Sequence, residues 1–190
     1  MFNLAVAISA YLIGSFPTAY VIGKHVKGID ISRNGTGNIG AMNAYEVTGS
    51  KTIGITVGLV DLLKGLLVTF LAQHELGSTA GLAAAFFAVL GHNYSIFMRF
   101  KGGRGLATAA GGLLIVQPLA VAVYLAVYFL LRISKLKLYF SSVSGIILAS
   151  IPIFTRFNYE PASAVFASLL LATILSKHLV PLKNELQNGI

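Results

Sequence analysis

The chain of 190 residues is 56% hydrophobic and only 11% charged, and its mean hydropathy is +0.80. Because soluble domains carry about 25% charged residues, this composition excludes an ordinary soluble domain and indicates an integral membrane protein. A spanning helix takes about 20 residues, so seven spans leave chain for loops only, and we expect one transmembrane domain over residues 1–190. The net charge of +8 would favour nucleic-acid binding on a soluble domain, but here it bears on membrane topology, and we expect no nucleic-acid partner.

Apolar runs in chain order predict an all-α, polytopic fold with seven transmembrane helices. The predicted spans cover residues 2–23, 52–73, 77–98, 105–116, 118–131, 138–155 and 161–176. The charge-free run 105–131 could also be one long helix. Pro118 favours a break there, because proline removes a backbone donor and disfavours helix immediately before it.

The basic residues predict the orientation, because cytoplasmic loops near span ends carry an excess of Lys and Arg. With the N-terminus outside, 12 of the 14 Lys and Arg residues fall in cytoplasmic segments. Only Arg156 lies outside and only Lys64 lies within a span. We therefore expect an N-out, C-in protein.

The longest loop, residues 24–51, contains Gly35, Gly37 and Gly40 in the spacing G-x-G-x-x-G. A dinucleotide fold is rejected, because that fingerprint needs a preceding strand and here a membrane helix precedes it. Glycines without Cβ still allow successive backbone N–H groups to converge on an anion. The alternative is a flexible re-entrant turn.

A second cytoplasmic loop places Lys101 and Arg104 around Gly102 and Gly103, and a helix is expected to follow directly from Gly105. A helix N-terminus carries unpaired N–H groups and a partial positive charge, so this loop is predicted to bind phosphate. A stop signal for translocation is the alternative, but it requires the cations and not the glycines.

The first span is interrupted by Pro17, which should kink the helix and free the Ile13 carbonyl, and Ser15 lies beside it at the depth of the two loops. Asp61 and Lys64 lie three residues apart in the second span, so their opposite charges share one helix face. A structural ion pair is our first interpretation, and a proton relay is the alternative.

His92 and His178 lie near the predicted inner interface, where either could act as a general base or be an ordinary hydrogen-bonded histidine. Ser141 and Ser144 add hydroxyl donors on the same side. The acids expected there, Asp30, Glu46 and Glu185, are too scattered for a magnesium site, and cysteine is absent. We therefore expect no metal and no cofactor, and a reaction between phosphate-bearing substrates.

These motifs resemble the bacterial acyl-phosphate:glycerol-3-phosphate acyltransferases (the PlsY family) over essentially the whole chain. The matching stretches are Gly14-Ser15 with Pro17 and Tyr20, residues 35–41 with Asn43, Asp61 with Lys64-Gly65, and Gly91-His92 with Phe97, Lys101–Gly105 and Ala107-Thr108. The resemblance implies an enzyme of the bacterial cytoplasmic membrane, with its active site facing the cytoplasm. It would transfer a fatty acyl group from acyl phosphate to the 1-hydroxyl of glycerol 3-phosphate, giving lysophosphatidic acid and phosphate.

The resemblance also implies roles for individual residues. Lys101, Arg104, the Gly102-Gly103 backbone, Ser141 and Ser144 would bind the phosphate of the donor, and Thr36, Asn38 and Asn43 would hold glycerol 3-phosphate. His92 and His178 would belong to the surrounding network. A substrate phosphate oxygen would accept the proton of the attacking hydroxyl. The catalytic residues would be His92, Lys101, Arg104 and His178. Substrate binding would also involve Ser15, Gly37, Gly40 and Gly105. Membrane lipids and an enzyme that synthesises acyl phosphate would be partners.

The chain departs from the family mainly on the acceptor side. Glu46 stands where the family has an arginine on the acceptor's phosphate, and a carboxylate there would repel a dianion. Met42, Pro181 and Asn184 replace family Thr, Asn and Arg. These departures predict a modified acceptor site, in which Arg33 could replace the lost charge. The alternative functions are an acyltransferase with another phosphorylated acceptor, and a small anion transporter or lipid-binding membrane protein.

Overall fold

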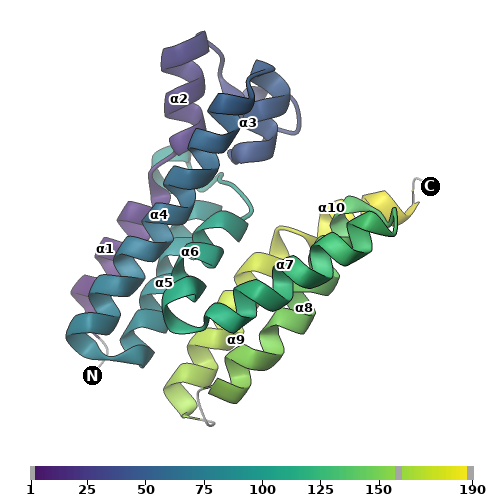
Figure 1. Ribbon diagram of the computed structural model, residues 1–190. Helices are drawn as coiled ribbons and strands as arrows, with labels where there is room; N and C mark the ends of the chain where they lie inside the picture. Colours follow the sequence, from purple (N-terminus) through teal and green to yellow (C-terminus); the bar gives the residue numbers. More distant parts are fainter. Residues whose placement is uncertain (1–2, 157–159, 188–190) are drawn as a thin grey trace.

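The computed structural model describes residues 3–156 and 160–187. Within these ranges all regular secondary structure is helical, joined by loops, and there is no strand (Figure 1). The all-α prediction is therefore confirmed. The helices are α1 (Leu4–Ser15), α2 (Thr18–Lys27), α3 (Ala41–Thr48), α4 (Lys51–Leu76), α5 (Ser78–Asn93), α6 (Leu106–Val116), α7 (Pro118–Ile133), α8 (Leu138–Arg156), α9 (Pro161–Ser176) and α10 (Leu179–Gln187), with short 3-10 helices η1 (Ile31–Arg33) and η2 (Ile96–Met98).

Each of the seven predicted apolar segments is helical. Among the described residues, five helical stretches are long and apolar enough to cross a membrane: Leu4–Lys27, Lys51–Leu76, Ser78–Met98, Leu138–Arg156 and Pro161–Gln187. The apolar helices α6 and α7 are shorter, with 11 and 16 residues. Two further helices, α3 and α10, were not predicted from the sequence. The count of seven spans stays a prediction.

The predicted interruption at Pro17 is present, because α1 ends at Ser15 and α2 begins at Thr18. The prediction that the Ile13 carbonyl is freed is wrong, because it accepts a hydrogen bond from the Phe16 N–H at 3.3 Å. The carbonyls of Ser15 and Phe16 instead receive side-chain donors. Ser95 Oγ donates to Ser15, and Lys64 Nζ donates to Phe16 at 2.7 Å. The carbonyls at the break are thus satisfied by α4 and by the segment between α5 and η2.

The predicted break before Pro118 is also present, since α6 ends at Val116 and α7 begins at Pro118. Gln117 between them is extended, and its Nε2 donates to the Pro152 carbonyl of α8 at 2.6 Å. This buried amide ties the α6–α7 junction to α8.

Glycines allow the helices to approach closely, as small residues do in membrane helix pairs. A Cβ on Gly65 of α4 would overlap the Thr108 carbonyl of α6, and a Cβ on Gly111 of α6 would overlap the Leu62 carbonyl of α4. A large apolar core lies between α5, α6, α8 and α9 and includes Leu82, Leu113, Ile146 and Leu170. In Figure 1 the N-terminus lies at the lower end of the view, whereas α2, α3, the segment before α6 and α10 lie at the upper end.

Gly65→Ala is expected to destabilise the protein by about 1–3 kcal/mol, because its methyl group would push α4 and α6 apart. Thermal unfolding in detergent measures this effect. Gly58→Ala on the same helix is the matched control, because its Cβ would meet the Ala41 Cβ at an ordinary 3.5 Å. Equal melting temperatures for the two variants would contradict the packing argument.

Candidate active site

The first glycine loop, residues 34–43, is folded around the side chain of Asn43. Its Oδ1 accepts from the Thr36 N–H at 2.9 Å, and its Nδ2 lies 3.0–3.2 Å from the carbonyls of Ile31, Asn34 and Asn38. Gly35 and Gly37 have φ of 60° and 69°, a left-handed conformation that glycine adopts without strain. Asn43 is buried and positions the loop in this structure. Its predicted contact with a substrate stays a prediction.

The other predicted residues of this loop surround Asn43. Thr36 is exposed, Asn38 is half-buried, and Gly40 precedes the first residue of α3. A Cβ on Gly40 would lie 2.9 Å from Asn38 Nδ2, so the loop packs against itself. Upstream, Asp30 caps η1, and the hydrogen bond from the Ser32 hydroxyl holds the pKa of Asp30 below its usual value.

Arg33 was expected to offer a free charge to the acceptor. In the structure its Nε lies 3.4 Å from the Asp30 carboxylate, and its side chain is 85% exposed. This ion pair with Asp30 partly offsets the positive charge that Arg33 could offer to a phosphate.

The second glycine loop, residues 101–105, lies directly on the end of α5. The Gly103 N–H donates to the His92 carbonyl at 3.0 Å, and a Cβ on Gly103 would overlap the His92 ring. Gly105 has φ of 78°, and its Cβ would lie 2.6 Å from Asn93 Oδ1. The structure shows that these glycines allow the loop to pack on α5, and their predicted contacts with phosphate stay a prediction.

The start of α6 has the properties expected of an anion site. Among the described residues, no side chain caps this 11-residue helix, so its first N–H groups remain available beside Gly105. Lys101 is exposed, and Arg104 is half-buried with its guanidinium carbon 4.7 Å from the centre of the Tyr139 ring. Arg104 is therefore held in place by an aromatic ring of α8.

The start of α8 differs from the expectation that Ser141 and Ser144 face a phosphate. Ser141 is buried, and its hydroxyl donates to the Lys137 carbonyl at 2.8 Å, while Ser144 is half-buried. The N–H groups of Tyr139 and Phe140 donate to the Glu185 carboxylate of α10 at 2.9–3.0 Å. An internal anion thus occupies this helix N-terminus. The proposed contacts of both serines with phosphate stay untested.

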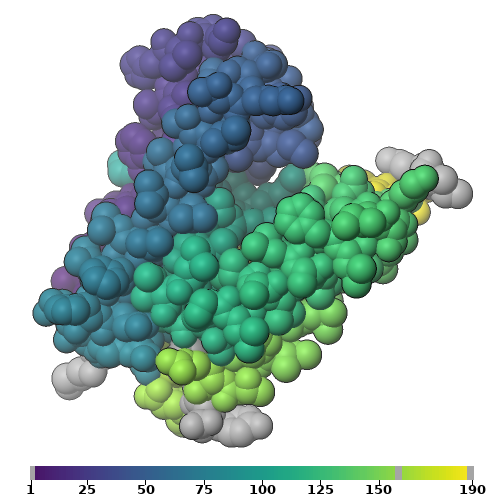
Figure 2. Space-filling model, in the orientation of Figure 1, coloured from purple at the N-terminus to yellow at the C-terminus, as the bar shows by residue number. Residues whose placement is uncertain are grey.

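A shallow cavity, open to solvent, joins the two glycine loops and the C-terminal helix. It is lined by Thr36, Arg104, Tyr139, Val180, Pro181, Asn184 and Glu185. Figure 2 shows a hollow between the purple-to-blue part of the chain and the green part. Glu46 is exposed on α3 and does not line this cavity, whereas Glu185 does, which sequence reasoning did not find.

Both predicted histidines are buried near the loops. His178 Nδ1 lies 2.8 Å from the Ile174 carbonyl, an arrangement that requires the proton on Nδ1 and leaves Nε2 as an acceptor. His92 lies beneath Gly103, with its Nδ1 3.7 Å from Asp61 Oδ1. Ser15 lines a smaller cavity together with His92, Gly102 and Gly103, and its hydroxyl has no hydrogen-bond partner among the described residues.

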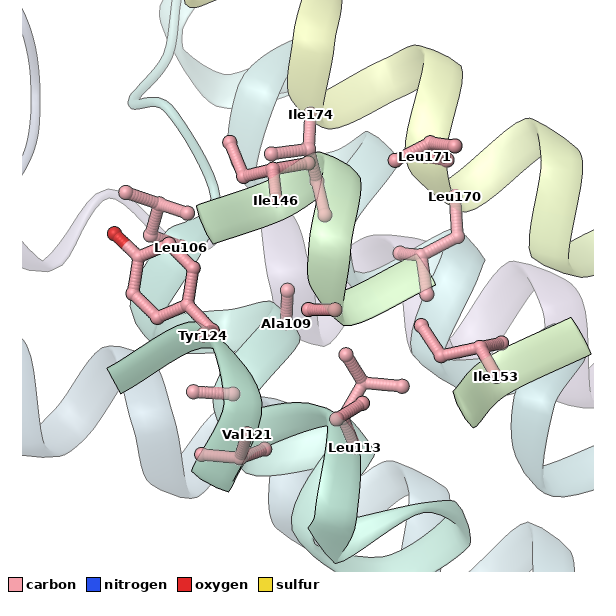
Figure 3. A pocket seen from close by; sticks show the side chains of 13 residues that line it. Leu106, Ala109, Leu113, Val121, Tyr124, Ile146, Ile153, Leu170, Leu171 and Ile174 are labelled. Atoms are coloured by element: carbon pink, nitrogen blue, oxygen red, sulfur yellow. The ribbon is translucent and has the colours of Figure 1, made fainter. Parts of the chain in front are cut away.

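A separate, narrow apolar pocket begins beside the second glycine loop (Figure 3). Leu106, which directly follows Gly105, lines it near Tyr124, and Leu113, Ile153 and Leu170 line it further along. Four alanines of α6, α7 and α8, at positions 109, 110, 120 and 149, keep the space open. Within the described parts of the chain, no group of three or more His, Asp or Glu side chains could hold a metal ion.

The fold is that of a helical membrane protein in which two glycine loops lie next to an apolar pocket. The family model for glycerol-3-phosphate acyltransferases matches residues 4–188. A relative from Moorella thermoacetica, glycerol-3-phosphate acyltransferase 2, is 40% identical over 92% of this chain and 88% of its own. The Bacillus subtilis glycerol-3-phosphate acyltransferase is 38% identical over 93% of this chain and 90% of its own.

Solved structures agree with the sequence relatives. Crystal structures of PlsY, an integral membrane glycerol 3-phosphate acyltransferase, in the glycerol 3-phosphate and lysophosphatidic acid forms match with TM-scores of 0.87 and 0.85. They are 31% and 30% identical, and each match covers 97% of this chain and 92% of the solved chain. This chain belongs to the glycerol-3-phosphate acyltransferase family, as the sequence resemblance predicted.

Glu185→Gln is expected to tighten the binding of inorganic phosphate by roughly threefold to tenfold, because a negative charge leaves the cavity while an acceptor remains for α8. Isothermal titration of the purified protein measures the dissociation constant. Glu160→Gln is the matched control, because Glu160 also accepts hydrogen bonds at a helix start, in its case from the Thr79 and Ser163 hydroxyls, but lies at the opposite end of α9 from α10. Weaker phosphate binding in Glu185→Gln would mean that the carboxylate supports the site instead of competing for it.

Proposed function

We propose that this protein transfers a fatty acyl group from acyl phosphate to the 1-hydroxyl of glycerol 3-phosphate, giving lysophosphatidic acid and inorganic phosphate for phospholipid synthesis. The observation that carries the proposal is that one cavity is lined both by Thr36 of the first glycine loop and by Arg104 of the second. The relatives in its family are glycerol-3-phosphate acyltransferases, and one solved relative is described in a lysophosphatidic acid form. Membership of this family favours an enzyme over a small anion transporter.

The second glycine loop is the proposed site for the donor's phosphate. Lys101 and Arg104 supply charge, and the free N–H groups at the start of α6 add hydrogen bonds. In the reaction the acyl carbon forms an ester bond with the attacking hydroxyl oxygen, and its bond to the phosphate oxygen breaks. The departing phosphate carries the electron pair, so fixed positive groups around it stabilise the transition state.

The proton of the attacking hydroxyl needs an acceptor. A phosphate oxygen of a substrate supplies one, as the family resemblance implies. His178, which is buried beside the cavity-lining helix α10, is a side-chain candidate for the same task. Its Nδ1 is engaged by the Ile174 carbonyl, which leaves Nε2 able to accept a proton. His92 is the second candidate, although its ring packs under the loop.

The apolar pocket next to Leu106 is the proposed site for the acyl chain of the donor. Leu106 follows the phosphate-binding loop directly, so a donor with its phosphate on that loop can extend its chain into the pocket. Burying the chain among α6, α7, α8 and α9 would supply most of the binding free energy of the lipid part. This arrangement supports acyl phosphate as the donor.

The first glycine loop is the proposed acceptor site, with Thr36 and Asn38 as polar contacts. Glu46 was the main reason to consider a different phosphorylated acceptor. It lies on the exposed side of α3 and outside the cavity lining, where solvent weakens its repulsion of a phosphate. This placement favours glycerol 3-phosphate, and other polyol phosphates stay as the alternative.

The proposed topology is a single domain over residues 1–190 with an N-out, C-in orientation in the bacterial inner membrane, seven crossing segments and a site facing the cytoplasm. The opposite placement of the N-terminus and α10 in Figure 1 supports this orientation, as does the positive charge of the loops near α10. Membrane lipids and a peripheral enzyme that synthesises acyl phosphate are the proposed partners.

The direct test supplies purified protein with palmitoyl phosphate and a panel of polyol phosphates and measures the lysolipid product by mass spectrometry. Lysophosphatidic acid formed from glycerol 3-phosphate in preference to the other acceptors is expected. Palmitoyl-CoA in place of palmitoyl phosphate should give no product. Preference for another acceptor would support the altered-acceptor alternative, and no lysolipid at millimolar acceptor would overturn the proposed function.

Ala149→Phe is expected to lower turnover of palmitoyl phosphate at least about tenfold, because the added ring would fill the apolar pocket. Turnover of octanoyl phosphate should change much less, since a short chain needs less of the space. Ile147→Phe is the matched control on the same helix, because Ile147 is exposed and lies outside the pocket lining. If both donors lost activity equally, the acyl chain would bind elsewhere.

A further inference from the structure

A buried polar cluster connects the break in the first span to the second glycine loop. Its centre is Asp61 Oδ1, which lies 2.8 Å from Lys64 Nζ, 2.9 Å from Thr18 Oγ1 and 3.7 Å from His92 Nδ1. All four residues are at most 8% exposed. Buried ionisable groups in a membrane protein are costly unless they are paired, so this cluster requires a physical explanation.

One part of the cluster acts as a lock between helices. Lys64 Nζ also donates to the Phe16 carbonyl at 2.7 Å, and Thr18 is the first residue of α2. The ion pair of α4 therefore satisfies the backbone that Pro17 leaves open and fixes α2 relative to α1. The contacts of Lys64 and Thr18 make up this lock, and His92 takes no part in it.

The remaining contact leads to the candidate active site. His92 carries the second glycine loop in two ways: its carbonyl accepts from the Gly103 N–H, and its ring fills the space that a Gly103 side chain would need. A Cβ on Gly102 would likewise overlap the His92 carbonyl. The backbone of Gly102 and Gly103 therefore follows the position and tilt of His92.

We infer that Asp61 is a positioning residue for the loop that binds the donor's phosphate and that it acts through His92. At 3.7 Å the carboxylate acts on the His92 ring through its charge and not through a hydrogen bond. It favours the tautomer whose proton is on the facing Nδ1, and Nε2 lies toward Gly103. Held in this way, the ring sets the height of Gly102 and Gly103 above α5, and with it the direction of the loop N–H groups. Asp61 touches neither glycine itself.

The inference rests on the proposed function only where its test measures KM values. Asp61 supports the second glycine loop, so its loss should weaken the binding of the donor and of inorganic phosphate. The first glycine loop is folded by Asn43 and not by this cluster, so the acceptor should bind almost as before.

The test uses the double variant Asp61→Leu/Lys64→Met, because removing one partner alone would leave a buried unpaired charge and unfold the protein. Replacing both with apolar residues of similar size removes the two buried charges together, and the Phe16 carbonyl still accepts from the Thr18 N–H. We expect the dissociation constant for inorganic phosphate and the KM for palmitoyl phosphate each to rise about tenfold, as small misplacements of binding groups do. The KM for glycerol 3-phosphate should stay within roughly twofold of the parent value.

Thr69→Val is the matched control, because Thr69 is buried on the same helix and its hydroxyl has no partner among the described residues. It should leave all three constants unchanged. A folded double variant with unchanged phosphate binding, or with equal losses for donor and acceptor, would overturn the inference. If the parent protein binds phosphate but forms no lysolipid, the proposed function fails while the phosphate titrations still decide the role of Asp61.

Discussion

A hydrocarbon solvent offers no hydrogen bonds, and the rest of this structure depends on that constraint. Every place where a helix stops within the apolar part of the chain has to be satisfied from inside the protein. At Pro17 the open carbonyls receive Ser95 and Lys64, and at the α6–α7 junction Gln117 reaches the Pro152 carbonyl. These buried polar side chains therefore lie where the chain bends.

The glycines then determine how closely the helices and loops can pack. The same property, a missing Cβ, has two different uses in this chain. In α4 and α6 it lets two helix backbones touch through Gly65 and Gly111. In the second glycine loop it lets the backbone rest on His92, so a loop without secondary structure acquires a defined position. The candidate site thus depends on helix packing for its geometry, although its polar groups come mainly from loops.

Much of this architecture could be predicted from the sequence, because it depends on neighbours along the chain. Hydropathy predicted the apolar helices, Pro17 and Pro118 predicted the breaks, and the three-residue spacing of Asp61 and Lys64 predicted their ion pair. The features that were missed depend on contacts between distant residues. Tyr139 and Glu185 are 46 positions apart, and nothing local to either indicates that one caps the helix of the other. The Ser141 hydroxyl donates to the Lys137 carbonyl just before α8, and its predicted contact with a ligand stays a prediction.

The position of α10 has a consequence for the fate of the acyl group. Val180, Pro181 and Asn184 of this short helix form one wall of the cavity, and Glu185 fastens the helix to α8. An acyl phosphate is an activated compound that water can attack as readily as an alcohol can, and an enzyme prevents such side reactions by excluding solvent. With acyl phosphate as the proposed donor, the C-terminal helix would therefore influence the partition between transfer and hydrolysis. A chain lacking this helix would then hydrolyse more of its donor even with both glycine loops intact.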